Sequence, residues 1–147
     1  MSPYQYSQLL SEPGSIRLFR LLPSEDDGAA IRGELLEYNL RSPRRATHAY
    51  EALSYVWGSS EHHVPILVGE DDDELDVTAN LHAALLQLRD TTFPRMLWID
   101  AICINQTNNE EKSYQIQSMA RIYAVASRVL SISKYTCLLY TSPSPRD

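Results

Sequence analysis

RMLWIDAICI, residues 95–104, is the most apolar stretch of this 147-residue chain, and it decides the predicted fold. It lacks the strict alternation of a strand with one face in water. A continuous apolar run of this length is typical of a central strand buried on both faces of a sheet. We therefore expect an α/β domain built around this strand.

Amphipathic helices are predicted on both sides of the central strand. Before it, residues 78–89 carry leucines at 81, 85 and 88, which share one helical face, and Thr78 is the expected N-cap. After it, Thr107 and Glu110 have the spacing of a capping box. The helix that follows, to about residue 127, is expected to bury one apolar face, made by Ile116, Met119, Ala120 and Tyr123.

Further strands are predicted from short apolar segments. Residues 16–22 (IRLFRLL) alternate apolar and basic side chains, as in a half-buried strand. Residues 64–68 and 75–77 flank an acidic turn and indicate a hairpin, with Pro65 placing the first strand at a sheet edge. The other expected strands are 31–40, 50–57 and 128–132. Strands that alternate with helices at this spacing favour βαβ crossovers and a largely parallel sheet.

Composition and charge exclude several classes of protein. The net charge is −6 and no broad basic face is apparent, so we expect no nucleic-acid partner. No signal peptide opens the chain, and no run reaches the ~18 apolar residues of a membrane-spanning helix. Cys103 and Cys137 lack both a disulfide framework and zinc-ligand spacing. These features predict a soluble cytoplasmic domain without a membrane partner or a bound metal.

Two blocks of sequence resemble the signature of the fungal heterokaryon incompatibility (HET) domain. They are YEALSYVWG, residues 50–58, and LWIDAICINQ, residues 97–106, which is followed by further similar residues through Tyr123. The resemblance covers about residues 16–130. Lys112 stands where the family usually has arginine.

The resemblance implies a role in fungal nonself recognition, in which the domain triggers or executes programmed cell death. The family is distantly similar to Toll/interleukin-1-receptor (TIR) domains, so it implies a flavodoxin-like, largely parallel sheet flanked by helices. Some TIR domains assemble as scaffolds, whereas others cleave nicotinamide from NAD.

Three regions are expected along the chain. Residues 1–14 form a loose leader, residues 15–132 a partial HET domain, and residues 133–147 an unstructured tail. The domain is expected to be truncated at its C-terminal end, because the resemblance stops after residue 130 while the family continues. The tail resembles translated sequencing-adapter sequence, and a natural disordered terminus is the alternative.

A candidate catalytic site follows from the central strand. Asp100 is expected near its carboxyl end, where ligands bind in open α/β sheets, together with Cys103, Asn105 and Gln106. Cleavage of NAD passes through a cationic sugar that a carboxylate would stabilise. Glu111 is the candidate for that role, with Asp100 as a second acid. The structural alternative for Glu111 is that a helix's first turn favours carboxylates.

The remaining candidates have strong structural alternatives. Tyr55, Trp57 and Trp98 would stack a nucleotide base, or else fill the core. Cys103 has no histidine tied to it by a motif and is expected to be a buried thiol. Gly58 and Gln115, from the two signature blocks, complete the candidate pocket.

The leading functional hypothesis is a non-enzymatic interaction module. It would act by self-association or by binding protein partners, with no cofactor. The alternatives are an NAD glycohydrolase, for which NAD is a substrate only, and a non-functional fragment. An enzyme should bring Glu111, Asp100 and Asn105 into one pocket.

Overall fold

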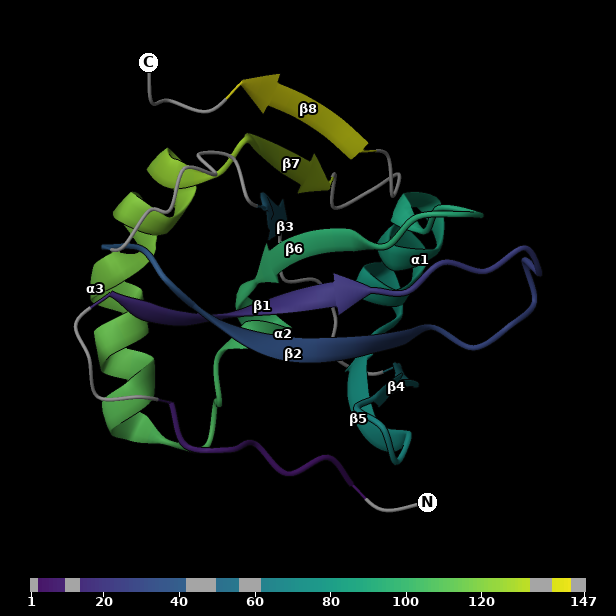
Figure 1. Ribbon diagram of the computed structural model, residues 1–147, viewed down its shortest axis with the longest axis horizontal. Helices are drawn as coiled ribbons and strands as arrows, with labels where there is room; N and C mark the ends of the chain where they lie inside the picture. The colour runs from purple at the N-terminus through teal and green to yellow at the C-terminus, as the bar shows by residue number, and fades with distance from the viewer. Residues whose placement is uncertain (1–2, 10–13, 42–49, 56–61, 133–138, 144–147) are drawn as a thin grey trace.

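The computed structural model describes residues 3–9, 14–41, 50–55, 62–132 and 139–143 of the chain. Five strands precede the first helix, and the helices lie in the second half of the chain, as Figure 1 shows. The elements in chain order are β1 (Ser15–Leu21), β2 (Arg32–Asn39), β3 (Glu51–Tyr55), β4 (His63–Val68), β5 (Asp73–Thr78), α1 (Ala79–Leu88), β6 (Arg95–Ile99), α2 (Asp100–Cys103), α3 (Asn109–Val125), β7 (Arg128–Ile132) and β8 (Leu139–Pro143).

The strands form one mixed sheet in the order β5-β4-β2-β1-β6-β3-β7-β8. Among the described strands, β6, β3 and β7 form a parallel group, and β2 and β4 share a short parallel contact. The other neighbouring strands are antiparallel. The α/β class is confirmed, whereas the expectation of a largely parallel sheet is wrong. Short connections join β1 to β2 and β4 to β5, and such connections produce antiparallel pairs.

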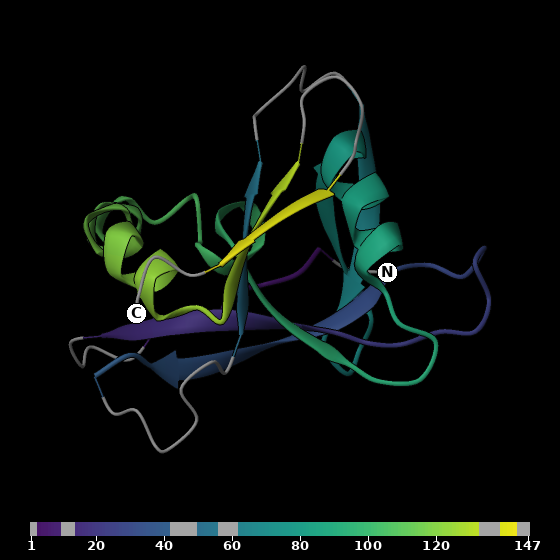
Figure 2. The same cartoon turned by 90° about the horizontal axis from the view of Figure 1, so that it is seen from above.

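The parallel strands lie between two helices. Figure 2 shows α1 and α3 on opposite sides of β3 and β7. In β6, Leu97, Trp98 and Ile99 are fully buried, which confirms the predicted central strand. The strand ends at Ile99, earlier than expected, because the chain turns into the short helix α2. That helix also buries Ile102 and Cys103, so the apolar run spans two elements.

The strand β1 is buried on both faces, not half-buried as its alternating pattern predicted. Ile16 and Leu18 point to one face and Arg17 and Phe19 to the other, and each is at most 3% exposed. β1 lies between β2 and β6. The pattern misled because the basic residue Arg17 is buried with a charged partner, which is described below.

The first helix matches its prediction, and the long helix differs in detail. The Thr78 hydroxyl accepts a hydrogen bond from the Leu81 N–H at 3.2 Å and caps α1 as expected. For α3, Asn108 is the N-cap, so the capping box predicted at Thr107 and Glu110 is wrong by one residue. Among the residues described, no helix is long and apolar enough to cross a membrane.

The buried face of α3 is also different from the predicted one. Ile116 and Ala120 are exposed, and Met119 and Tyr123 are only partly buried. The buried residues of α3 are Gln115 and Ile122, which lie about two helical turns apart on a neighbouring stripe of the helix. The apolar spacing misled because α3 rests on the sheet along a stripe that includes a polar side chain.

The predicted hairpin is confirmed, but its edge strand is not the expected one. β5 forms the edge and β4 lies between β5 and β2. Pro65 pairs only with Asp76 of β5, because the ladder to β2 reaches just Leu67 and Val68. A proline is tolerated at this position because no donor to β2 is needed there.

Both ends of the chain are more ordered than predicted over their described residues. In the expected loose leader, the Tyr4 N–H donates to the Glu74 carbonyl at 2.8 Å, and the Tyr6 hydroxyl donates to the Ile102 carbonyl at 2.6 Å. In the expected unstructured tail, β8 pairs antiparallel with β7. Backbone pairing at two strand edges therefore orders segments whose composition alone indicated loops.

Candidate functional site

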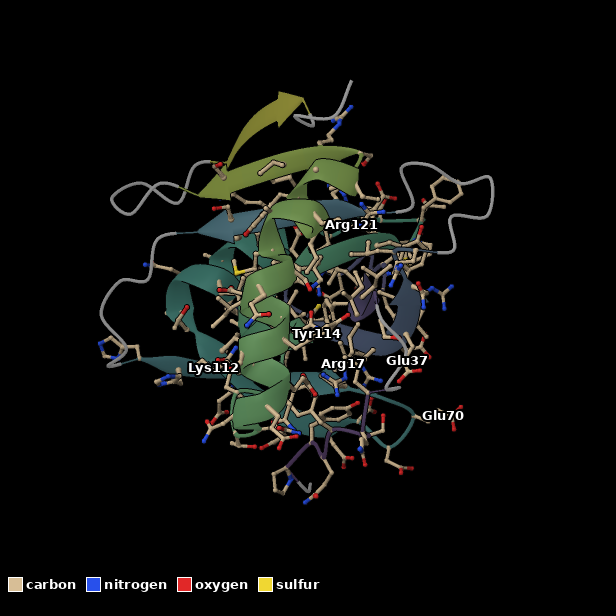
Figure 3. The ribbon with its side chains drawn as sticks, turned by 90° about the vertical axis from the view of Figure 1, so that its left-hand side faces the viewer. Arg17, Glu37, Glu70, Lys112, Tyr114 and Arg121 are labelled. Carbon is tan, nitrogen blue, oxygen red and sulfur yellow. The ribbon has the colours of Figure 1, made fainter. Side chains whose placement is uncertain are left out.

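A buried ion pair joins the first strand to the long helix. One guanidinium nitrogen of Arg17, Nη2, donates to Glu111 Oε1 at 2.9 Å, and Nη1 donates to Oε2 at 2.5 Å. The two side chains are only 4% and 7% exposed. This fork-to-fork geometry is the strongest form of side-chain ion pair, because it combines two charge-assisted hydrogen bonds. Figure 3 shows Arg17 beside the N-terminal half of α3.

Arg17 also binds backbone groups from two other segments. It donates to the Ser7 carbonyl at 2.7 Å and to the Cys103 carbonyl at 3.3 Å. Its guanidinium lies 5.0 Å from the ring centre of Tyr6, within the range of a cation–π interaction. The Arg17 cluster, defined as Arg17, Glu111, Tyr6 and these two carbonyls, thus ties four segments together.

The carboxylate of Glu111 accepts three hydrogen bonds. Besides the two bonds from Arg17, Oε2 accepts the Asn105 N–H at 2.7 Å. Asn105 follows α2 within the second signature block, so Glu111 fixes the path of the chain there. A carboxylate with these three donors is placed to support structure. The catalytic role predicted for Glu111 stays a prediction, and its buried ion pair speaks against it.

Asp100 lies in a separate groove and not beside Glu111. This acid groove has a volume of about 280 Å³ and is lined by Asp100, Ile104, Gln106, Lys112, Ile116 and Met119. Burial raises the pKa of the Asp100 carboxyl group above its ordinary value. The Gln106 amide donates to the Asp100 backbone carbonyl at 2.9 Å. The groove brings together two of the predicted site residues, Asp100 and Gln106, without Glu111.

The remaining predicted site residues lie in the core, at the end of a strand or outside the residues that the structure describes. Burial raises the pKa of the Cys103 thiol to about 12, which disfavours the thiolate form that a nucleophile needs. Trp98 is fully buried, with its ring 5.7 Å from that of Tyr123 in an edge-to-face arrangement. Tyr55 lies at the end of β3, while Trp57 and Gly58 lie outside the described residues.

Gln115 is a buried polar residue of the helix–sheet interface. Its amide nitrogen donates to the Ser15 carbonyl at 3.0 Å, and its Oε1 has no hydrogen-bond partner among the described groups. Gln115 therefore anchors α3 to β1. It lines neither the acid groove nor the groove described next.

A second groove, which the sequence analysis missed, lies on the other flank of α3. This basic groove has a volume of about 480 Å³ and is lined by Gly14, Leu40, Arg41, Tyr114, Gln117, Ser118 and Arg121. Figure 3 shows Tyr114 and Arg121 on one side of α3 and Lys112 on the other. The other helical residues of this groove follow Tyr114 by three, four and seven positions, so all of them lie on one stripe of α3. This spacing is the sequence signal that could have indicated the groove. The contributions of Gly14 and Arg41 had no signal in the sequence.

The part of the chain that the structure describes contains no candidate metal site. No group of three or more His, Cys, Asp or Glu side chains there could hold an ion.

Comparison with known proteins gives two matches. The family model described as "Heterokaryon incompatibility protein (HET)" matches residues 50–136. A curated relative from Neurospora crassa, "Heterokaryon incompatibility protein 6, OR allele", is 36% identical over 136 residues. That alignment covers 84% of this chain and 19% of the relative, so the chain spans about a fifth of the relative's length. No solved structure matches.

Proposed function

Because the chain belongs to the heterokaryon incompatibility (HET) family, we propose that it acts in fungal nonself recognition as a non-enzymatic interaction module that triggers programmed cell death. It would do so in the cytoplasm, by self-association or by binding a partner protein. The observation that carries the non-enzymatic assignment is the position of Glu111. Its carboxylate is buried and occupied by Arg17 and the Asn105 N–H.

The alternative is an NAD glycohydrolase that uses Asp100. The raised pKa of Asp100 and its place in the acid groove favour this alternative, since general acids are often tuned in this way. A kinship with TIR domains is part of the proposal, and it is supported by the parallel group β6, β3 and β7, which has a helix on each side. Fold-level likeness alone is a weak warrant for a reaction.

Inducible expression of the chain in a filamentous fungus distinguishes these functions, with viability and total NAD measured together. We expect cell death while NAD stays constant until membranes fail. The control is Leu85→Asp, which places a charge in the core of α1 and should abolish killing. Killing by this control, or survival with the unmodified chain, would contradict the proposal.

The Asp100→Asn variant tests the enzymatic alternative. If NAD falls before death and Asp100→Asn prevents both, the chain is a glycohydrolase and the interaction module is wrong. If Asp100→Asn kills as efficiently as the unmodified chain, Asp100 has no catalytic role. Co-precipitation of two differently tagged copies tests self-association directly.

A further inference from the structure

The basic groove has a wall that the backbone builds around Gly14. Gly14 has a φ of +88°, a conformation open to glycine at little cost. Its N–H donates to the Tyr114 hydroxyl at 2.5 Å, and its carbonyl accepts the Leu40 N–H at 2.8 Å. A Cβ on Gly14 would lie 2.7 Å from Cγ of Arg41, so the arginine stem packs directly on this backbone. Arg41 and Tyr114 are thus held on the same short segment.

The charges of the groove are unbalanced. Five of the six other arginines that the structure describes have carboxylate partners at 4.0 Å or less, namely Arg17, Arg20, Arg32, Arg95 and Arg128. The sixth, Arg89, donates to backbone carbonyls instead. Among the residues that the structure describes, Arg41 and Arg121 have no carboxylate partner, and none of those that line the groove is acidic. Two exposed guanidinium groups that face one groove, in a chain of net charge −6, indicate a site for an anion.

The uncharged lining residues add matching donors. The Tyr114 hydroxyl already accepts from Gly14, so its own hydrogen is available for a second acceptor. Gln117 is exposed on the same helical stripe and carries an amide donor. Guanidinium groups bind phosphate oxygens in a two-pronged geometry, and the phenol ring offers a face for an organic group. The volume of about 480 Å³ lies within the usual range for small-molecule sites.

We propose that the basic groove binds a small organic phosphate of nucleotide size. Arg41 and Arg121 hold the phosphate oxygens, and Tyr114 donates a hydrogen bond and packs against the organic part. This site is distinct from the acid groove and from the Arg17 cluster. It does not depend on the proposed function, because it is tested by direct binding to the purified chain.

The experiment is a calorimetric titration of the purified chain with ADP, in parallel with adenosine and with inorganic phosphate. We expect saturable ADP binding, no binding of adenosine, and weaker binding of phosphate. Arg121→Gln and Arg41→Gln should each weaken ADP binding by roughly tenfold or more, because each removes charge-assisted hydrogen bonds to the phosphate. Tyr114→Phe should weaken it by less, since the ring remains.

The matched control is Arg20→Gln, which removes an equal charge from an arginine already paired with Glu34. Binding by this variant should be unchanged. Thermal unfolding of each variant checks that the fold is intact, and Arg121→Lys should retain part of the affinity. The proposal is wrong if ADP binds with a Kd weaker than about 1 mM, if Arg20→Gln and Arg121→Gln weaken binding equally, or if a phosphoserine peptide binds more tightly than ADP.

Discussion

The two helices on either side of the parallel strands are attached to the sheet in different ways. α1 has ten residues and buries four apolar ones, Leu81, Ala84, Leu85 and Leu88. α3 has 17 residues and buries only Gln115 and Ile122. Besides the apolar packing of Met119, Tyr123 and Val125 on the core, α3 makes several directional contacts. They are the Arg17 cluster and the bonds from Gln115 to Ser15 and from Gly14 to Tyr114. A helix that buries few of its side chains completely leaves both flanks free to line grooves, whereas α1 fills the core.

The largest expected effect is the loss of half of the buried ion pair. Arg17→Met leaves the Glu111 carboxylate buried without its cation, and it should lower the free energy of unfolding by about 4 kcal/mol. Urea denaturation measures the change. The double variant Arg17→Met/Glu111→Leu is the control and should recover much of the loss, because no charge stays buried. Equal losses in the single and double variants would mean that α3 depends on packing, as α1 does.

A core truncation in α1 is the corresponding test for the first helix. Leu85 is fully buried, so Leu85→Ala should cost about 3 kcal/mol through lost apolar burial and a residual cavity. Leu86→Ala on the exposed side of α1 is the matched control, and it should change stability by less than about 0.5 kcal/mol. The same urea titration applies. A cost near zero at Leu85 would contradict the description of α1 as a core element.

The N-cap residues of α1 and α3 allow a test of the same comparison with a smaller expected effect. Thr78→Ala and Asn108→Ala each remove one hydrogen bond to a first-turn N–H, which typically costs about 1 kcal/mol. Thr78 is buried and Asn108 is exposed, so the Thr78 variant should lose more. Thermal unfolding of the two variants side by side measures the order. The reverse order would contradict the expectation that the buried cap of α1 contributes more than the exposed cap of α3.

The smallest effect concerns the acid groove. Burial raises the folded-state pKa of Asp100, so its contribution to stability is greatest at low pH and is lost as the pH rises through that pKa. The Asp100→Asn side chain cannot ionise, so the variant does not lose stability in this way as the pH rises. The variant should be slightly more stable than the unmodified chain at pH 7, and the gap should close below the unfolded value of about 4. Urea denaturation midpoints of the variant and the unmodified chain, measured between pH 3 and pH 7, test this prediction. A stability difference that widens in acid would contradict it.

The sequence was sufficient where local periodicity and burial agree. The leucine spacing and Thr78 defined α1, and the apolar run located β6. The same reasoning misjudged the sheet, because pairing directions depend on which strands become neighbours. Nothing local indicates that β1 lies between β2 and β6.

The site was harder to predict than the fold for the same reason. Arg17 and Glu111 lie 94 residues apart, and Gly14 and Tyr114 lie 100 apart. Contacts at that separation have no local signature in a single sequence. Asp100 and Gln106 are near neighbours along the chain, and they share a groove that lacks Glu111, so the catalytic role of Asp100 stays a prediction. Glu111 was assigned correctly to the first turn of α3, and its burial beside Arg17 changes what that position can do.

The place of β3 in the sheet has a consequence for the order of folding. β3 lies between β6 and β7, and both partners are synthesised long after it. While the chain emerges from a ribosome, β3 can pair with β6 once residues 95–99 have been made, but its other edge stays unpaired until residues 128–132 follow. Contacts between segments so distant in sequence slow folding and leave strand edges open to other chains. The step that completes the parallel core is thus the arrival of β7.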